Sequence, residues 1–247
     1  MDHFDNLGAG YAKFMKDDPM RNGLHYPAVL AKLDATKRGV RQRILDVGCG
    51  AGLLDQMMAI HPDREVTAFD PSRSFIEIAE EEERKQPLGI RYYRASAHEF
   101  KTEQRFDDAV SVMALPYAPD AAYLSQFFRA ASGPLENGRD FTSVVFNPAF
   151  KAFNLRIGNR MFSRTDDGKV QVHFIDPASG EEVWKTTPTV LTQFTTGEYE
   201  TGARDGGFTK VAWEKLYPGE DAKEEFGLKF WEACEREQPY ALLIATK

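Results

Sequence analysis

The pattern of apolar and polar positions changes its period several times along the 247-residue chain. Apolar residues in the stretches between short strand-like runs recur three and four positions apart, as on one face of a helix. Strands that alternate with such helices predict βαβ units and a parallel sheet. We therefore expect an α/β fold with a doubly wound, mostly parallel seven-stranded sheet. The predicted strands are residues 44–47, 65–70, 89–94, 106–113, 140–146, 208–213 and 240–246.

The βα rhythm is interrupted at residues 150–195. Residues 169–175 and 182–186 alternate apolar and polar positions on either side of a turn-forming segment, which predicts a hairpin, and residues 189–194 are a possible third strand. An antiparallel insert after the fifth strand would stand over the carboxyl ends of the parallel strands, where ligands bind in such sheets. The insert is rich in aromatic residues, so we interpret it as a substrate cap; a dimerisation arm or a small core of its own are the alternatives.

The two ends of the chain complete the predicted domain. Residues 1–40 show helical spacing broken twice by turn residues, which predicts two short helices that form an N-terminal cap. Towards the other end, residues 196–204 and 220–237 are predicted helices. Because no repeat or low-complexity linker divides the chain, we expect residues 1–247 to form a single domain.

Composition narrows the possible functions. The chain is 42% hydrophobic and 12% aromatic, carries a net charge of −7, and has no block of Lys and Arg, which argues against nucleic acid as a partner. Two cysteines, Cys49 and Cys234, are too few for a disulfide framework or a zinc site, and no metal-ligand cluster is visible. The amino terminus lacks an apolar leader, and no apolar run is long enough to cross a membrane, so we expect a cytoplasmic protein.

The most informative stretch is the turn after the first strand. Gly48, Gly50 and Gly52 stand at alternate positions, where missing Cβ atoms let a ligand approach the backbone. Asp46, at the strand's end, precedes them in the pattern D-x-G-x-G-x-G. A dinucleotide fingerprint has G-x-G-x-x-G instead, and a carboxylate at this point repels a pyrophosphate but accepts hydrogen bonds from an ammonium group. A glycine turn that binds nothing is the alternative.

This turn resembles the first motif of the class I S-adenosylmethionine-dependent methyltransferases, which have a Rossmann-like fold. Asp70 ends the second strand, where an acidic residue is placed to accept both hydroxyls of a ribose, and Pro71 follows it. The alternative role of Asp70 is an N-cap on the next helix, for which Ser72 is equally available. The resemblance implies that S-adenosylmethionine is the cofactor.

Residues 106–120 resemble the fourth-strand motif of small-molecule methyltransferases, except that Pro116 stands where that pattern often has histidine. The resemblance implies that Ser111, Val112 and Met113 flank the sulfonium end of the cofactor. Leu115 and Tyr117 would face the substrate, with core packing as the alternative. Residues 206–213 resemble the turn into the sixth strand that this family shares.

Two weaker matches lie elsewhere in the chain. The turn after the third strand usually has aspartate in this family, and here it has Ser96, followed by Ala97 and His98 near the expected adenine position. Tyr11 and Arg21 resemble residues of the family's N-terminal segment, which implies that they bind the cofactor carboxylate or line the substrate mouth. The alternative is that Tyr11 packs on the core and Arg21 is solvated. The cofactor set is thus Tyr11, Arg21, Asp46, Gly48, Cys49, Gly50, Asp70, Pro71, Ser96, Ala97, His98, Ser111, Val112 and Met113.

Methyl transfer from a sulfonium needs orientation more than acid or base catalysis. We expect N- or O-methylation of a small aromatic or heteroaromatic acceptor, by a monomer or homodimer; a weaker similarity is to the toxoflavin-type azapteridine N-methyltransferases. The alternatives are a non-catalytic module that binds S-adenosylmethionine or S-adenosylhomocysteine, and an NAD-binding oxidoreductase. Candidate bases, where one is needed, are His98, Tyr117, His173 and Glu198. Candidate substrate contacts are Tyr11, Leu115, Tyr117, Phe150 and Trp184.

Overall fold

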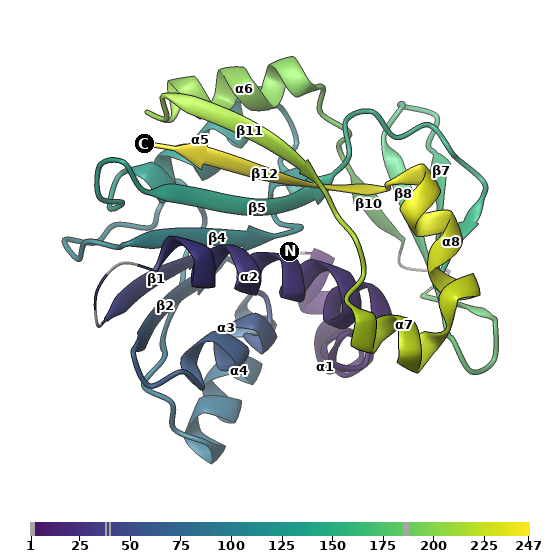
Figure 1. Cartoon of the computed structure of the whole chain (residues 1–247), viewed down its shortest axis with the longest axis horizontal. Coiled ribbons are helices and arrows are strands. Elements are labelled where there is room, and N and C mark those ends of the chain that lie inside the picture. Colours follow the sequence, from purple (N-terminus) through teal and green to yellow (C-terminus); the bar gives the residue numbers. More distant parts are fainter. Residues whose placement is uncertain (1–2, 38, 40, 185–187) are drawn as a thin grey trace.

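The computed structural model describes residues 3–37, 39, 41–184 and 188–247, and a seven-stranded sheet lies at its centre (Figure 1). Its strands are β1 (Gln42–Val47), β2 (Arg64–Asp70), β3 (Arg91–Arg94), β4 (Asp108–Val112), β5 (Asp140–Phe146), β11 (Lys210–Lys215) and β12 (Tyr240–Thr246). The strand order is β11-β12-β5-β4-β1-β2-β3. Strands β1 to β5 pair in parallel, whereas β12 runs antiparallel to both β5 and β11. The prediction of a mostly parallel seven-stranded α/β sheet is confirmed.

Helices cover both faces of this sheet (Figure 1). Strand β1 shows why, because Ile44 packs into the hydrophobic core on one face while its neighbours Leu45 and Val47 pack into the core on the other. The first core lies under α1 to α4 and the second under α5 and α6. The helices of these two layers are α1 (His3–Lys16), α2 (Tyr26–Thr36), α3 (Leu53–Ala59), α4 (Arg73–Lys85), α5 (Ala121–Ser132) and α6 (Thr196–Asp205).

The chain reverses its direction of travel across the sheet between β1 and β4. Strands β2 and β3 are added on one side of β1, and β4 and β5 on the other. In open α/β sheets, such a switch point leaves a crevice at the carboxyl ends of the two central strands, because the loops that follow them diverge to opposite faces. The topology therefore places the glycine turn after β1 beside the segment that follows β4.

The prediction of a single helix over residues 220–237 is wrong. Residues 220–237 form two helices, α7 (Glu220–Phe226) and α8 (Leu228–Glu237), because Gly227 adopts φ 78° and ψ 149° and breaks the helical ladder. The pair is joined by the indole of Trp231, whose N–H donates to the carbonyl of Ala222 at 3.0 Å. Helix α7 packs closely on the N-terminal segment, where a Cβ on Gly23 would lie 2.7 Å from the Ala222 Cβ.

The insert is a separate antiparallel sheet after β5. The predicted hairpin is present as β8 (Val170–Ile175) and β9 (Glu182–Val183), and the third strand, β10 (Thr189–Leu191), pairs with β8. Two strands that were not predicted, β6 (Arg156–Ile157) and β7 (Arg160–Arg164), extend the sheet on the other side of β8. Predicted strand positions 185 and 186, and positions 1, 2, 38 and 40 of the predicted N-terminal cap, lie outside the described residues.

The predicted N-terminal helices are α1 and α2, with a π-helical turn, η1 (Arg21–His25), between them. This segment is tied to the insert by the buried carboxylate of Asp18. Its Oδ1 accepts from the Asn159 side chain at 2.8 Å, and its Oδ2 accepts from the Arg160 guanidinium at 2.7 Å and from the backbone N–H of Arg21 at 3.2 Å. These donors, with Arg160 foremost among the charges, keep the pKa of Asp18 below its ordinary value despite burial. The N-terminal segment and the insert therefore pack as neighbours.

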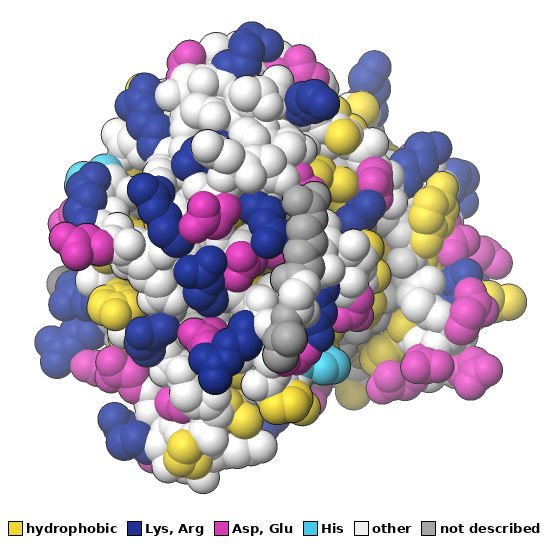
Figure 2. Space-filling model, turned by 60° about the vertical axis from the view of Figure 1, so that its left-hand side comes forward, with side chains coloured by type: hydrophobic (Ala, Val, Ile, Leu, Met, Phe, Trp, Pro, Cys, Tyr) yellow, Lys and Arg dark blue, Asp and Glu magenta, His cyan; other side chains and the backbone are white. Residues whose placement is uncertain are grey.

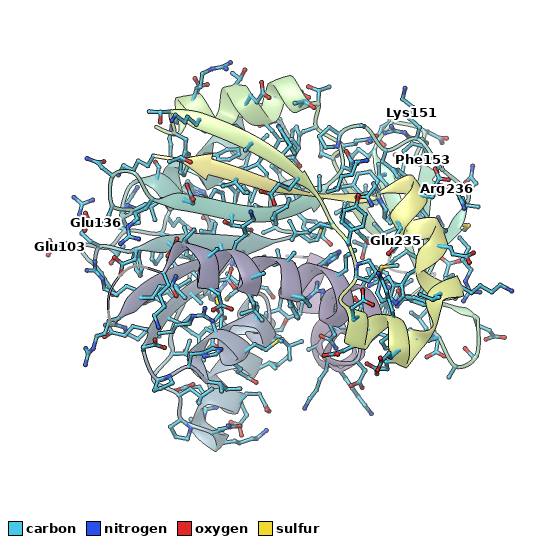
Figure 3. All side chains as sticks on the ribbon, viewed as in Figure 1. Glu103, Glu136, Lys151, Phe153, Glu235 and Arg236 are labelled. Atoms are coloured by element: carbon cyan, nitrogen blue, oxygen red, sulfur yellow. The ribbon has the colours of Figure 1, made fainter. Side chains whose placement is uncertain are left out.

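The side chains labelled in Figure 3 lie at the two far ends of the molecule. Figure 3 shows Lys151 and Phe153 on the insert and Glu235 and Arg236 on α8 at one end, with Glu103 and Glu136 at the opposite end. On the face seen in Figure 2, Lys and Arg side chains are interspersed with Asp and Glu. Within the described part of the chain, no helix combines the length and the apolar character that crossing a membrane requires.

Candidate active site

A cavity of about 490 Å³ opens at the carboxyl ends of the central strands, within the size range of small-molecule sites. Its walls come from the glycine turn, the ends of β1, β2 and β4, the N-terminal segment and the first turns of α5. The lining includes ten of the fourteen predicted cofactor residues: Tyr11, Arg21, Asp46, Gly48, Cys49, Gly50, Asp70, Pro71, Val112 and Met113.

The glycine turn packs so closely on its neighbours that a residue with a Cβ would not fit. Gly48 has φ 79°, and a Cβ there would lie 2.4 Å from the Cβ of Ala114 in the segment after β4. Gly50 has φ 57°, and its N–H donates to Oδ2 of Asp70 at 2.9 Å. The turn thus brings β1, β2 and the end of β4 together and presents its backbone to the cavity.

The two predicted carboxylates both line the cavity, in different environments. Oδ1 of Asp70 accepts from the Ser72 N–H at 2.9 Å, in addition to the bond from Gly50. The N-cap of α4 is Ser72, whose hydroxyl accepts from the N–H of Phe75, so capping is not the role of Asp70. Asp46 is only 2% exposed, and no described donor reaches its Oδ1. Burial is the main cause that raises the pKa of Asp46 to about 7.

Arg21 brings a partly buried cation to the same cavity. Its guanidinium donates to the hydroxyl of Tyr26 at 3.4 Å and to that of Tyr11 at 3.3 Å. Burial raises the pKa of Tyr26, so this partner is a neutral phenol. The side chain of Asp18 is engaged by Arg160 and by the Arg21 backbone. Arg21 lines the cavity from a π-helical turn, a feature found often at functional sites.

The remaining wall is apolar and aromatic. Met113, just after β4, has φ 59°, an uncommon conformation for a side-chain-bearing residue and one that clusters at ligand sites. Tyr117 lies in η2 (Leu115–Tyr117), where its hydroxyl contacts that of Tyr11 and burial raises its pKa well above the ordinary value. Several wall residues were not predicted as site residues. Helical periodicity was the only signal for Met15, Phe75, Tyr123 and Phe127, whereas Tyr26 also stands in the Tyr-Pro pair that resembles the family's N-terminal segment.

Four predicted cofactor residues do not line this cavity. Ser96 bonds instead to the Glu99 carboxylate and to Nδ1 of His98, the latter at 2.9 Å. Ser111 is fully buried and donates to the carbonyl of Val47 at 2.7 Å, so it joins β4 to β1. Ala97 packs in the core under α5, and exposed His98 lines a separate hollow.

Two predicted substrate contacts are placed in the core instead. Leu115 has no exposed surface and packs under α5, because η2 turns it away from the cavity. Phe150 packs on Phe146 and Phe162, with ring centroids 5.2 and 5.3 Å away. Trp184 does not line the cavity either. Its ring contacts the ring of Tyr11, a residue that does line the cavity, with the two ring centroids 5.3 Å apart.

Three of the four candidate bases lie away from the cavity, and one of them is His98, in the separate hollow described above. His173 sits on the insert, where Nε2 bonds to the Ser163 hydroxyl and Nδ1 to the Glu182 carboxylate, each at 2.7 Å. Glu198 forms the capping box of α6 with Thr195. The geometry corrects both expectations, since hydrogen bonds on other elements hold these side chains. Tyr117 is the one candidate base that lines the cavity among the described residues.

The part of the chain that carries this site is similar to known proteins. Residues 44–138, which carry the glycine turn, Asp70 and the β4 segment, match a family described as "Methyltransferase domain". A sugar N-methyltransferase, KedS8 of Streptoalloteichus sp ATCC 53650, shares the fold at TM-score 0.63 with 20% identity, covering 98% of this chain and 94% of that one. The chain is thus similar to that family over residues 44–138, and it shares its fold with structures of S-adenosylmethionine-dependent methyltransferases.

More particular likenesses are partial. The ubiquinone biosynthesis O-methyltransferase of Coxiella burnetii (strain RSA 493 / Nine Mile phase I) is 34% identical over 113 residues, 45% of this chain and 47% of that protein. The enzyme of the same name from Histophilus somni (strain 2336) is 33% identical over 120 residues, 46% of this chain and 49% of that protein. The chain thus spans about half the length of these curated relatives. The structure of S-adenosylmethionine-bound CalS10, an amino pentose methyltransferase of Micromonospora echinaspora, aligns at TM-score 0.61 with 18% identity over 96% of this chain and 95% of that one.

Proposed function

We propose that this protein transfers the methyl group of S-adenosylmethionine to a nitrogen or oxygen atom of a small aromatic or heteroaromatic acceptor. The observation that carries the proposal is one cavity in which a glycine turn stands between two carboxylates, Asp46 and Asp70. A pyrophosphate would be repelled by this arrangement, whereas a nucleoside with an amino-acid end suits it.

The charges in the cavity match the two ends of such a ligand. Tyr26 accepts a hydrogen bond from Arg21, and it also lies close enough to Asp46 to feel the charge of that carboxylate. A cation and an acid therefore meet at one end, which suits the carboxylate and the ammonium of an amino acid. At the other end, the carboxylate of Asp70 is the kind of acceptor that ribose hydroxyls require.

The acceptor would occupy the aromatic part of the cavity. Tyr11, Phe75 and Tyr117 line it beside Met113, which supports a flat acceptor held by ring contacts. Methyl transfer gains most from holding the acceptor atom in line with the sulfonium, so the main task of these residues is orientation. Because the pKa of Tyr117 is raised, its hydroxyl is neutral and would act as a hydrogen-bond partner for the acceptor.

The neighbouring segments support a cap over this site. The N-terminal segment contributes Tyr11 and Arg21 to the walls, and the insert contacts it through Asp18 and through the ring of Trp184. Closing both over the cavity would exclude water from the reacting atoms. A dimerisation role for the insert is the competing proposal, and sedimentation of the protein at several concentrations separates the two.

Cofactor binding is tested with Asp70→Ala. We expect the substitution to weaken S-adenosylhomocysteine and adenosine binding alike, by about 2 kcal/mol, because both ligands carry the ribose. Isothermal titration calorimetry measures the affinities, and Glu77→Gln, an exposed change on α4, is the matched control. Unchanged affinity in a folded Asp70→Ala protein would refute the ribose role.

Catalysis is tested separately from binding. Wild-type protein is incubated with S-adenosylmethionine and a panel of phenols and nitrogen heterocycles, and methylated products are sought by mass spectrometry. Product from any member supports an enzyme. Cofactor binding without product across the panel favours a non-catalytic module, whereas binding of NAD but not S-adenosylhomocysteine would overturn the proposal.

A further inference from the structure

A second buried carboxyl group lies against Asp46 beneath the glycine turn. Asp55, in the first turn of α3, has no exposed surface and does not itself line the cavity. Its carboxyl group and that of Asp46 are in hydrogen-bonding contact. No described N–H donor reaches either oxygen of Asp55 or Oδ1 of Asp46, and a hydroxyl group, that of Tyr92, bonds to Asp55.

Two carboxylates in such contact cannot both remain ionised. With both deprotonated, only acceptors would face each other in a buried place, whereas one proton turns the contact into a hydrogen bond. The groups that face the pair are Asp70 of β2, Cys49 of the turn, Tyr26 of α2 and Tyr92 of β3.

None of these four neighbours supplies a positive charge that would stabilise the second anion. Burial raises the pKa values of the Cys49 thiol and of both tyrosines, so these three groups are neutral. Asp70 is the fourth, and a carboxyl group can only add negative charge. Burial likewise raises the pKa of Asp55 well above its ordinary value.

We propose that Asp55 is a positioning residue that shares a proton with Asp46 in the ligand-free protein, and that binding of the cofactor's ammonium group expels this proton. The inference rests on the proposed function, because it assigns the ammonium to Asp46. The exchange balances: a carboxyl O–H bond breaks, the proton passes to the buffer, and an ammonium N–H takes its place as the donor to Asp46.

Cofactor affinity then depends on pH in a defined direction. The proton must leave for the ammonium to bind, so affinity rises with pH until the pair has lost that proton in the free protein as well. Because burial raises the pKa of Asp46 to about 7 and the pKa of Asp55 well above its ordinary value, affinity rises with pH through the range below about pH 7, by at most about tenfold per pH unit. The amino group of the ligand stays protonated over this range, so it does not contribute.

The experiment measures how many protons are released for each ligand that binds. S-adenosylhomocysteine is titrated into wild-type protein and into Asp55→Asn at about pH 6, in phosphate and in imidazole buffers, whose ionisation enthalpies differ. We expect wild type to release a large fraction of one proton per ligand and Asp55→Asn to release markedly less. The amide of the variant can donate to Asp46, but it holds no acidic proton that the pair could share or release. Adenosine, which lacks the amino-acid end, should release almost none from either protein.

Three outcomes separate the possibilities. Equal proton release by wild type and Asp55→Asn, or no release by wild type with S-adenosylhomocysteine, overturns the inference. Equal release with adenosine and S-adenosylhomocysteine overturns it too, and this comparison needs no variant. Failure of wild type to bind S-adenosylhomocysteine refutes the proposed function instead. Adenosine binding by Asp55→Asn shows that the variant is folded.

Discussion

Two clusters of buried carboxyl groups lie near the cavity, and they are built in opposite ways. Asp18 is 1% exposed and accepts three hydrogen bonds, including one from the Arg160 guanidinium. Asp46 and Asp55 are 2% and 0% exposed, face each other, and have donors for few of their oxygens. Both clusters are removed from water, but only the first contains a countercharge.

This difference separates a structural role from a binding role. A buried carboxylate is tolerated when a cation and donors replace its water, so the Asp18 cluster can hold the N-terminal segment to the insert. Carboxyl groups that lack such partners reduce the stability of the free protein, and they gain most when a ligand brings a positive charge. The unsatisfied cluster is the one that reaches the cavity, through Asp46.

The largest expected effect follows from removing the negative charge of Asp18, which balances the Arg160 guanidinium. Asp18→Asn leaves the guanidinium of Arg160 buried without an anion, and we expect it to lower the free energy of unfolding by about 3–5 kcal/mol. Urea unfolding monitored by circular dichroism measures the loss. Glu77→Gln breaks an exposed ion pair with Arg73 and serves as control, with a change below about 1 kcal/mol. A loss from Asp18→Asn as small as that of the control would show that the two clusters do not differ as described.

The pH dependence of the unfolding free energy tests His25, which lies beside the Asp18 cluster and whose ring nitrogens have no described hydrogen-bond partner. His25 is 3% exposed, neither ring nitrogen has a described hydrogen-bond partner, and burial lowers its pKa to about 3. The unfolded chain takes up this proton near pH 6.5, so the stability due to the neutral ring is lost as the pH falls below that value, by about 1.4 kcal/mol per pH unit.

His25→Phe keeps an aromatic ring against Tyr240, which His25 contacts with centroids 4.3 Å apart, and it cannot take up a proton. Between about pH 6.5 and pH 4.5, its unfolding free energy should therefore fall less steeply than that of wild type. Parallel slopes in urea titrations at each pH would show that His25 is already protonated, or accessible, in the folded state.

The smallest expected effect concerns a carboxylate that is exposed and fully engaged. Glu198→Ala breaks the capping box of α6 and should cost about 1 kcal/mol of stability. Because Glu198 lies away from the cavity, S-adenosylhomocysteine affinity and any methyl-transfer rate should stay unchanged. A large loss of rate at full stability would restore Glu198 as a candidate base.

The sequence alone was most informative where the residues of the site are close together in the chain. Asp46, Gly48 and Gly50 follow one another within five positions, and each must have its own residue type because of backbone conformation or charge. The position of Asp70 follows from the strand–helix–strand spacing. These local features predicted the fold class, the cofactor and one side of the cavity.

The other side was decided by packing between segments distant in the chain. Helical periodicity showed that Phe75 and Phe127 lie on apolar faces, but not which of those faces meets a cavity. Asp55 was not singled out, because an acid in the first turn of a helix is ordinary until burial places it against Asp46. Leu115 and Tyr117 are two positions apart, and η2 sends one into the core and the other to the cavity.

The amino-acid sequence by itself thus determined the parallel sheet, the glycine turn and the two carboxylates beside it, because short-range sterics and charge depend on neighbouring residues. Only the tertiary structure decided which carboxyl groups are buried together, which cation lines the cavity and which histidine has no hydrogen-bond partner among the described residues. Those properties depend on burial and on contacts between residues far apart in the chain, such as Asp18 and Arg160, and no local pattern encodes them.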